Sequence, residues 1–428
     1  MRPPVRGTTR LLYGAGLAAA LVLPAAVAPA QAAPLSRTPA SPHPRTPVVL
    51  PAADGKKGQE LPGMPTALDP GAEAVACTPA SEEKAKKQDW SRQRLDLDRL
   101  RRHSTGAGAG VTVALISTGV DPGAAGLDGR VTARGEAADD CVGHGTFLAG
   151  LIAGTGGNTP RLAGVAPGAK ILALRGTDRR GQPDPELVTA AVRAATTARA
   201  DVIAVAVAFP RKDTALTRAV AEARKAGAVV VAAATPDPPS RGSADEMASR
   251  TYWPAGEPGV LAVADMLPAG TRPDGALPTG TVDLAAPGAG VVSGGPRGSG
   301  HYLGSGVAVA TAYAAGTAAV VRATHPDDSA EAVTRRLTAT AYPADLPQLD
   351  AYAAVTTVLG EPGAPAAGAG RAAGSVTVRD TSDTDRATGR ATLFVLLGSA
   401  GVLAVLWAGF ALTRARARGW RPAGADQA

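Results

Sequence analysis

Two stretches of the chain place polar side chains where a fold could use them for chemistry. In "GHGT", His144 lies between two glycines at the expected start of a helix, and glycines let the backbone approach the imidazole closely. In "VTVALISTGVDP", Ser117 ends an apolar run just before a turn. Each residue also has an ordinary interpretation, as a structural histidine and as a strand-end serine. Serine and histidine can serve as nucleophile and base, so the fold that positions them decides between these interpretations.

From Gly110 onward, short apolar runs alternate with helical patterns. The runs "VTVALI", "KILALR", "DVIAVAVAF", "GAVVVAAA" and "GVLAVAD" are typical of strands buried on both faces. Helices are predicted over 184–200 and over 213–227, the second with a capping aspartate and a terminal glycine. Strands joined by helices predict an α/β fold whose parallel sheet is covered on both faces. Sites in such folds collect at the carboxyl ends of the strands, and Ser117 lies at one of them.

The composition allows a large globular domain and argues against nucleic-acid binding. Of the 428 residues 45% are hydrophobic but only 3% aromatic, so Ala, Val, Leu and Ile must form the core. The net charge is +7, but the arginines are scattered and no aromatic residues are interleaved with them. The sequence shows no His/Cys/Asp cluster at metal-ligand spacing, and we expect no metal and no cofactor.

The amino terminus is typical of a secretory signal peptide, predicted over residues 1–32. Arginines precede the apolar run Leu11–Val27, and "APAQAAP" offers a cleavage site after Ala32 or nearby. An uncleaved amino-terminal anchor is the alternative. Residues 33–85 form an extension rich in Pro and Ala, and its stretch Pro34–Ala76 lacks the apolar pattern of a segment that folds alone. We expect that stretch to be a linker-like arm.

The carboxyl terminus contains a second uncharged apolar segment, "TLFVLLGSAGVLAVLWAGFAL". A transmembrane helix over 391–412 is long enough to cross the hydrocarbon core of a membrane. The tail over 413–428 is basic, which is typical of the cytoplasmic side. With residues 360–390 as a flexible linker, we expect a single-pass protein of the cell membrane with its globular part outside the cytoplasm. A buried core helix is the alternative for the apolar segment.

Two cysteines, Cys77 and Cys141, are present. An even number of cysteines in an oxidising compartment favours a disulfide bond, and two free thiols are the alternative. In the chain-entropy model a loop of this length would stabilise the fold by about 4 kcal/mol.

Several motifs in a fixed order make the chain resemble a known family. The strings "VALISTGVD", "GHGTFLAGLIAG", "GVAPGAKILALR", "VVVAAAT", "LAAPG" and "GVAVATAYAAGTAAVVRA" follow the order and spacing of motifs in the subtilisin-like serine peptidases. The resemblance extends over about residues 91–360. A signal peptide, two cysteines at the matching positions and a carboxyl-terminal span make the chain similar to the mycosins, the membrane-anchored subtilases of type VII secretion systems. It implies a subtilisin-like three-layer sandwich with a mainly parallel central sheet, in a peptidase domain over 86–359.

The resemblance also gives roles to particular positions. His144 matches the general base of the family. Ser117 stands where the family has the aspartate that orients this base, and Thr235 stands where it has the oxyanion asparagine. Ala308 occupies the position of the nucleophilic serine, and Ala312 replaces the proline of the same motif.

These replacements predict a catalytically inactive subtilase, because a methyl group at position 308 cannot attack a carbonyl. We expect a role in binding or assembly, with a peptide or protein in the former substrate cleft or with type VII secretion membrane components as partners. One alternative is an active serine endopeptidase in which Ser305 is a displaced nucleophile. Another is a membrane-tethered structural module unrelated to secretion. Nearby carboxylates could serve the base without supplying a nucleophile; they are Asp121, Asp128, Asp139 and Asp140.

Overall fold

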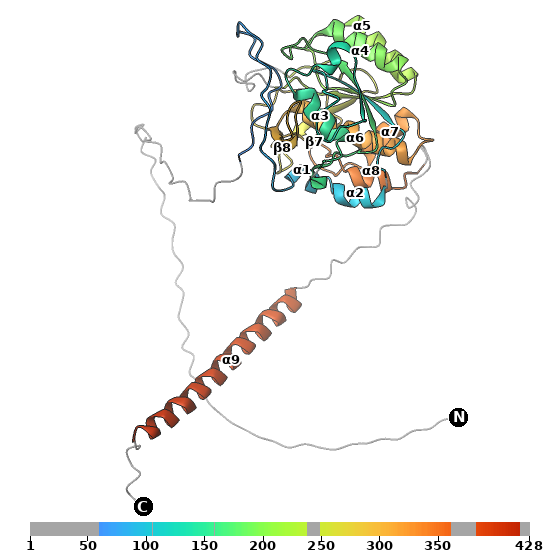
Figure 1. Cartoon of the computed structure of the whole chain (residues 1–428). Coiled ribbons are helices and arrows are strands. Elements are labelled where there is room, and N and C mark those ends of the chain that lie inside the picture. Colours follow the sequence, from blue (N-terminus) through green and yellow to red (C-terminus); the bar gives the residue numbers. More distant parts are fainter. Residues whose placement is uncertain (1–59, 105, 158, 238–248, 361–381, 420–428) are drawn as a thin grey trace, which may run out of the picture. The chain divides into compact units, whose positions relative to one another are not determined.

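The computed structural model describes residues 60–104, 106–157, 159–237, 249–360 and 382–419, and it confirms the predicted α/β fold (Figure 1). Seven strands form one parallel sheet in the order β2-β3-β1-β4-β5-β6-β7. The strands are β1 (Thr112–Ser117), β2 (Val131–Thr132), β3 (Lys170–Arg175), β4 (Val202–Val205), β5 (Val229–Ala233), β6 (Leu261–Met266) and β7 (Leu284–Pro287). Each of the five apolar runs of the sequence supplies one of these strands. A separate antiparallel pair consists of β8 (Val291–Gly294) and β9 (His301–Gly304).

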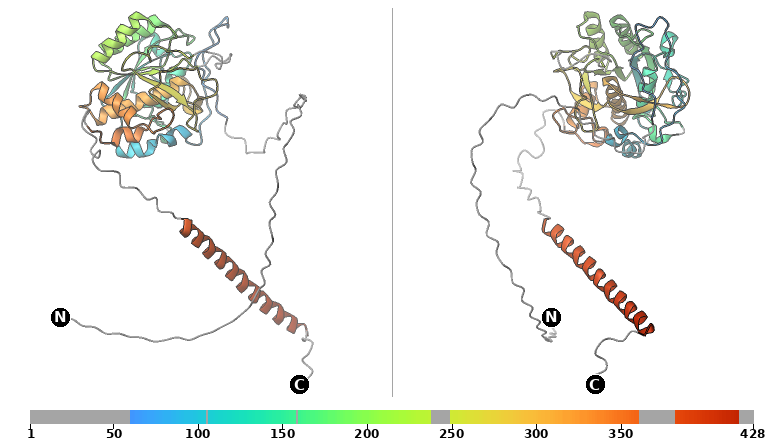
Figure 2. Two further views of the ribbon diagram at one scale, coloured as in Figure 1. Left: turned by 180° about the vertical axis from the view of Figure 1, so that it is seen from behind. Right: turned by 90° about the vertical axis from the view of Figure 1, so that its left-hand side faces the viewer.

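Helices cover both faces of the sheet, which gives the three layers that the sequence predicts. On one face α4 (Pro185–Thr197) and α5 (Thr214–Lys225) lie side by side (Figure 1). The other face carries α3 (His144–Ala153), α6 (Val307–Thr324), α7 (Ala330–Ala339) and α8 (Ala351–Thr356). Figure 2 shows these helical layers in two further views. The alternation of side chains along β1 separates the two cores, with Val113 and Leu115 in one and Ala114 and Ile116 in the other.

The two helices that the sequence predicts between strands begin with side-chain caps. Asp184 accepts a hydrogen bond from the backbone N–H of Glu186 at 2.8 Å, and Asp213 accepts one from Leu216 at 2.7 Å. Gly227, with a φ of 91°, follows α5 as its terminal glycine. Both helix predictions are therefore confirmed.

The central helix α6 is buried along most of its length. Every residue from Val307 to Val321 is buried. Close packing requires glycine at 316, because an added Cβ would lie 2.9 Å from the Cβ of Val165. The helix is long and apolar enough to cross a membrane, but 83% of it is buried within the domain. It is therefore a core helix that presents its amino terminus at the carboxyl edge of the sheet.

The described part of the amino-terminal extension lies along the domain. The N–H of Met64 donates to the carbonyl of Leu303 in β9 at 2.9 Å, and the N–H of Leu68 donates to Arg180 at 2.7 Å. A disulfide bond joins Cys77 to Cys141, which precedes α3. Residues 60–76 thus differ from the expected linker-like arm. Main-chain hydrogen bonds hold them in place, and such bonds leave no hydrophobic pattern in the sequence.

Two short helices, α1 (Trp90–Arg94) and α2 (Leu97–His103), follow the extension, and two 3-10 turns, η1 (Gly135–Ala138) and η2 (Pro160–Leu162), lie within the domain. The long helix α9 (Ser382–Ala417) contains the predicted span over 391–412. Its part from Phe394 to Ala417 is a candidate membrane span, and an 18-residue window within it has a mean hydropathy of 2.2. The predicted signal peptide, residues 361–381 of the predicted linker and the end of the basic tail lie outside the described residues.

Candidate functional site

A cleft of about 890 Å³ at the carboxyl edge of the sheet contains several residues that the sequence singles out. The end of β1 supplies Ser117, and the start of α3 supplies His144. The chain after β5 adds Pro236 and Asp237. Apolar lining comes from the end of β4, at Ala206, Val207 and Ala208. The serine and the histidine that are 27 positions apart in sequence therefore line one cavity.

His144 is almost fully buried, with 4% of its surface exposed. Neither ring nitrogen has a hydrogen-bond partner among the described residues. Burial lowers the pKa of His144 to about 4, so the imidazole is neutral at pH 7. A neutral imidazole has one N–H donor and one acceptor nitrogen that a bound group can use.

Ser117 packs against the start of α3. A Cβ added at Gly145 would overlap the Oγ of Ser117 and the carbonyl oxygen of Gly119, so this close approach requires a glycine. Ser117 is 1% exposed, and its Oγ has no hydrogen-bond partner among the described residues. A hydroxyl at this position can accept a hydrogen bond from an imidazole, but unlike a carboxylate it cannot balance the charge of an imidazolium.

Asp140 is a buried carboxylate next to this site, but its hydrogen bonds are made elsewhere. It accepts from the hydroxyl of Thr118 at 2.8 Å, from the N–H of Gly143 at 2.8 Å, and from the N–H and hydroxyl of Thr146 at 2.7 Å. Burial raises its pKa, against the effect of these bonds. The carboxylate fixes the loop before α3 and thereby positions His144.

The other three nearby carboxylates are also committed elsewhere or lie away from the cleft. The side chain of Asp121 accepts from the N–H of Gly123 at 2.9 Å. Asp139 forms an exposed ion pair with Arg179 at 3.4 Å. Asp128 lines a different cavity. None of the four carboxylates is therefore hydrogen-bonded to the imidazole of His144.

Asp237 is a site residue that the sequence analysis missed. Its Oδ1 accepts a hydrogen bond from the backbone N–H of Val307 at 2.6 Å and a longer one from Ala308 at 3.4 Å. The carboxylate thus acts as a cap of α6 that comes from a distant part of the chain. Gly306, with a φ of 128°, allows this approach, because a Cβ there would overlap the carboxylate. Burial, with a smaller effect of the charge on Asp265, raises the pKa of Asp237 to about 7.

The two remaining predicted positions are Ala308 in α6 and Thr235, two residues before Asp237. Ala308 lies in the first turn of α6 and is 2% exposed. Thr235 is buried, its hydroxyl has no partner among the described residues, and it does not line the cleft. The side chain that reaches the N–H of Ala308 is that of Asp237. The signal for it was the string "AAATPD", which places an acidic residue just beyond the end of β5.

Ser305, the displaced nucleophile of the alternative interpretation, is hydrogen-bonded outside the cleft. Its Oγ accepts a hydrogen bond from the N–H of Gly290 at 2.9 Å, and Ser305 is not among the residues that line the cleft. The first turn of α6, residues 307–310, consists of valine and alanine. The first turn of α6 therefore carries no hydroxyl or thiol, and Ala308, like Ser305, is not among the residues that line the cleft.

The amino-terminal extension forms one wall of the cleft through residues 65–70. The guanidinium of Arg180 holds this segment, since it donates to the carbonyls of Asp69 at 2.6 Å and Ala72 at 2.8 Å. A segment that precedes the domain in sequence thus limits what can enter the cleft.

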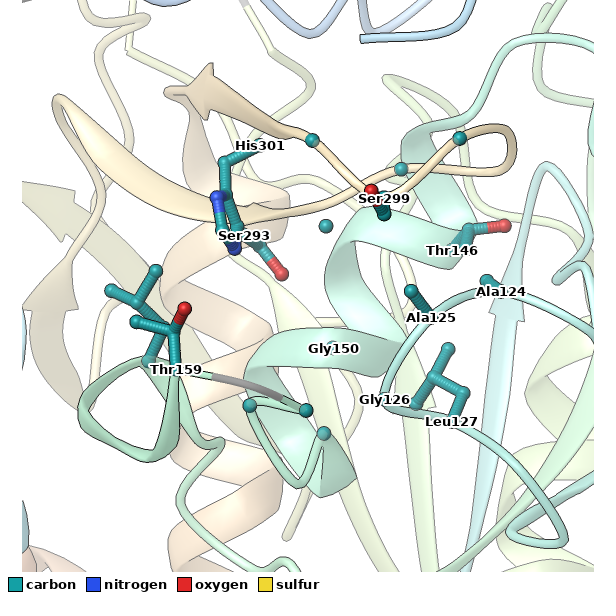
Figure 3. Close-up of a pocket in the computed structure, with 18 of the residues that line it drawn as sticks. Ala124, Ala125, Gly126, Leu127, Thr146, Gly150, Thr159, Ser293, Ser299 and His301 are labelled. Carbon is teal, nitrogen blue, oxygen red and sulfur yellow. The ribbon is translucent and has the colours of Figure 1, made fainter. Parts of the chain in front are cut away.

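A second cavity of about 270 Å³ lies beside α3 and the β8–β9 pair (Figure 3). Thr146 and Gly150 of α3 line it, together with Ser293 and His301 of the strand pair. The Nδ1 of His301 accepts from the N–H of Ala85 at 3.1 Å, which places the proton of the neutral ring on Nε2. None of the four positions matched to catalytic residues of the family lines this cavity. Within the described part of the chain, no group of three or more His, Cys, Asp or Glu side chains could hold a metal ion.

Comparison with known sequences agrees with the arrangement of the sheet and cleft. Residues 108–380 match the subtilase family. Mycosin-3 of Mycobacterium tuberculosis is 30% identical over 328 residues, which cover 61% of this chain and 70% of mycosin-3. Subtilisin E of Bacillus subtilis is 32% identical over 246 residues, which cover 56% of this chain and 62% of subtilisin E.

Solved structures show the same similarity. The MycP3 protease from the type VII (ESX-3) secretion system is 29% identical with a TM-score of 0.55, over 68% of this chain and 91% of the other. A chain of an intact ESX-5 inner membrane complex is 24% identical with a TM-score of 0.58, over 82% and 97% of the two chains, and this match shows the fold alone. The family match covers more than half of the chain and agrees with its fold, and the chain therefore belongs to the subtilase family.

Proposed function

We propose that this protein is a mycosin-like subtilase without peptidase activity, which binds a peptide or protein segment in the former substrate cleft. The observation that carries the proposal is the first turn of α6. Ala308 stands there at the nucleophile position, and its N–H faces the carboxylate of Asp237. A methyl group cannot form an acyl-enzyme, and an N–H near a protein carboxylate is a poor donor for a substrate oxyanion. The cleft of about 890 Å³ nevertheless remains open to a ligand.

The place of action that we propose is a type VII secretion complex at the cell membrane. Mycosin-3 and the MycP3 protease of a type VII system support this assignment as relatives of the chain. The apolar part of α9 is long enough to anchor the chain. Arg414, Arg416 and Arg418 at its end favour a cytoplasmic carboxyl terminus, with the domain on the opposite side of the membrane.

Labelling with a fluorophosphonate probe tests the loss of activity. The full-length chain, purified in detergent, is compared with an Ala308→Ser/Ser117→Asp/Thr235→Asn variant and with the same variant carrying Asp237→Asn. We expect no labelling of the unaltered chain. We expect the strongest labelling when Asp237 is also replaced, because asparagine removes the negative charge that would repel an oxyanion next to the N–H of Ala308.

Stoichiometric labelling of the unaltered chain would overturn the proposal. Loss of that labelling in Ser305→Ala would then identify Ser305 as a displaced nucleophile. The melting temperature of each variant serves as the control for folding.

Membrane extraction tests the anchor. The full-length chain should stay in the membrane fraction at alkaline pH, whereas a chain that ends at residue 381, before α9, should be released. Retention of the shortened chain would instead support an uncleaved amino-terminal anchor. Purification of the full-length chain from membranes without any secretion component would favour a structural module unrelated to secretion.

A further inference from the structure

The cleft is acidic in a chain whose overall charge is positive. Asp69 and Asp237 line it, and the described lining residues include no lysine or arginine, although the net charge of the whole chain is +7. We propose that the cleft binds a positively charged group of a peptide, an ammonium or a guanidinium, and that the carboxylate of Asp237 anchors it. This inference rests on the proposed function, because it names the class of segment that the cleft takes.

Asp237 is held in the geometry that an anchor needs. The N–H groups of Val307 and Ala308 both donate to Oδ1, and neither donates to Oδ2. The side chain is half-buried and lines the cleft. The two hydrogen bonds to Oδ1 also fix the position of Oδ2, so Oδ2 loses little freedom when it binds a cation. A charge-assisted hydrogen bond in a partly buried site is among the stronger ones.

Two further polar side chains in the cleft lack partners. Ser117 is 1% exposed and His144 is 4% exposed, and among the described residues neither the Oγ of Ser117 nor either ring nitrogen of His144 has a hydrogen-bond partner. Buried polar atoms without partners carry a free-energy cost that a ligand can remove. An ammonium or a guanidinium offers several N–H donors, and the serine oxygen and the unprotonated imidazole nitrogen are acceptors.

The basic side chains nearby are already engaged. Arg180 directs its guanidinium at the carbonyl oxygens of Asp69 and Ala72. Arg272 donates to the carboxylate of Asp265 at 3.4 Å. The walls at residues 206–208 are apolar, and electrostatic attraction is stronger beside apolar walls than in bulk water. Within the described part of the chain, the contacts of these basic side chains therefore leave the charge of Asp237 available to a ligand.

The pH dependence of binding gives a second test of whether the carboxylate of Asp237 holds the cation. Among the described residues, the charged or titratable groups that act on Asp237 or share its cleft are Asp265 with Arg272, Asp69 and His144. Burial raises the pKa of Asp237 to about 7 and lowers that of His144 to about 4, so the histidine stays neutral above pH 5. Binding of a cation to the carboxylate form should therefore strengthen as the pH rises from 5.5 to 8.

The test uses fluorescent pools of hexapeptides, randomised over uncharged residues at five positions. In three acetylated pools the sixth position is lysine, norleucine or glutamate. A fourth pool has norleucine at that position and is not acetylated, so its amino terminus is free. Binding to the full-length chain is measured by fluorescence anisotropy. We expect the lysine pool to bind about tenfold to a hundredfold more tightly than the norleucine pool, the size of one charge-assisted hydrogen bond. Tighter binding of the fourth pool would assign the cation to the peptide amino terminus, and tighter binding of the lysine pool would assign it to a side chain.

Asp237→Asn should abolish this difference, whereas Asp128→Asn, an exposed carboxylate of the other cavity, should preserve it. Equal affinity of all pools for the unaltered chain would overturn the inference and leave peptide binding intact. Absence of binding by every pool would overturn both the inference and the proposed peptide binding. The comparison of pools on the unaltered chain remains decisive even where Asp237→Asn fails to fold.

Discussion

Ala308 and Asp237 affect two different requirements of acyl transfer. With Ala308 at the nucleophile position, as we propose from the family resemblance, acyl transfer lacks its nucleophile, and the nearby carboxylate weakens the backbone N–H of Ala308 as a donor to an oxyanion. Restoring the serine alone therefore meets only the first requirement. Ser117 leaves a third requirement unmet, because it cannot balance a charged imidazolium. At the residue scale, we therefore propose that His144 is a retained base with no nucleophile to activate.

His144 makes the fold less stable in acid. Burial places the pKa of the folded state at about 4, below the ordinary value of 6.5, so the unfolded chain binds a proton first as the pH falls. The stabilising effect is complete above about pH 6.5 and is lost toward pH 4, by about 3 kcal/mol for a pKa difference of this size. We expect His144→Gln to show a flatter dependence of the free energy of unfolding on pH over this range, measured by urea denaturation.

Asp237→Asn is the matched control, because its effect has the opposite sign. The folded pKa of about 7 lies above the ordinary value of 3.8, so this carboxyl loses stability as the pH rises from about 4 to 7. Removing it should make stability rise more steeply with pH. An unchanged slope in His144→Gln would contradict the buried, neutral state of the histidine.

At the scale of elements, a buried ion pair joins α1 to the domain. The guanidinium of Arg92 contacts the carboxylate of Asp89 at 2.5 Å, and the two side chains are 0% and 4% exposed. Arg92 also donates to the carbonyls of Leu162 at 2.8 Å and Val292 at 2.9 Å. The carboxylate of Asp89 accepts from the N–H of Val292 at 2.8 Å. This network fastens α1 to β8 and to the turn η2.

Arg92→Met should lower the free energy of unfolding by about 3–5 kcal/mol, because it leaves the carboxylate of Asp89 buried without its partner. Arg179→Met removes an exposed ion pair with Asp139 and should change stability by less than about 1 kcal/mol. Denaturant unfolding of both variants measures the difference. Similar small losses in the two variants would show that the buried pair contributes no more than a surface pair.

At the scale of the whole molecule, the disulfide between Cys77 and Cys141 joins the extension to the loop before α3. It closes a loop of 64 residues in sequence. Cys77→Ser/Cys141→Ser should lower the free energy of unfolding by about 4 kcal/mol, because the unfolded chain gains the freedom that the bond removes. Peptide mapping without reductant should recover Cys77 and Cys141 in one linked fragment. Recovery of both as free thiols would contradict the bond.

The disulfide also holds the part of the extension that forms one wall of the cleft. Residues 65–70 line the cleft, and the disulfide fixes the chain just beyond them. The same double variant should therefore loosen this wall, and limited proteolysis should cleave it near residues 65–76 sooner than in the unaltered chain.

Periodicity and local signals were enough to predict most of the domain. The five apolar runs predict buried strands, which are four to six residues long in the structure, and Asp213 with Gly227 specifies the ends of α5 through contacts within a few residues. The order of motifs was enough to predict the family, and Ser117 and His144 do line one cleft, whereas the catalytic roles matched to these two residues and to Ala308 stay predictions. These signals are local, so they can be read without knowing the fold.

Asp237 and the wall of residues 65–70 could not be predicted in this way. Asp237 caps a helix that begins 70 positions later, and the wall is held by main-chain hydrogen bonds to residues far along the chain. Neither contact depends on a pattern of neighbouring side chains. Local sequence signals were thus enough for five strands of the sheet and the helices α4 and α5, whereas the loss of a nucleophile at Ala308 stays a prediction. Only the tertiary structure decided which charge faces the cleft, because that depends on segments that packing brings together.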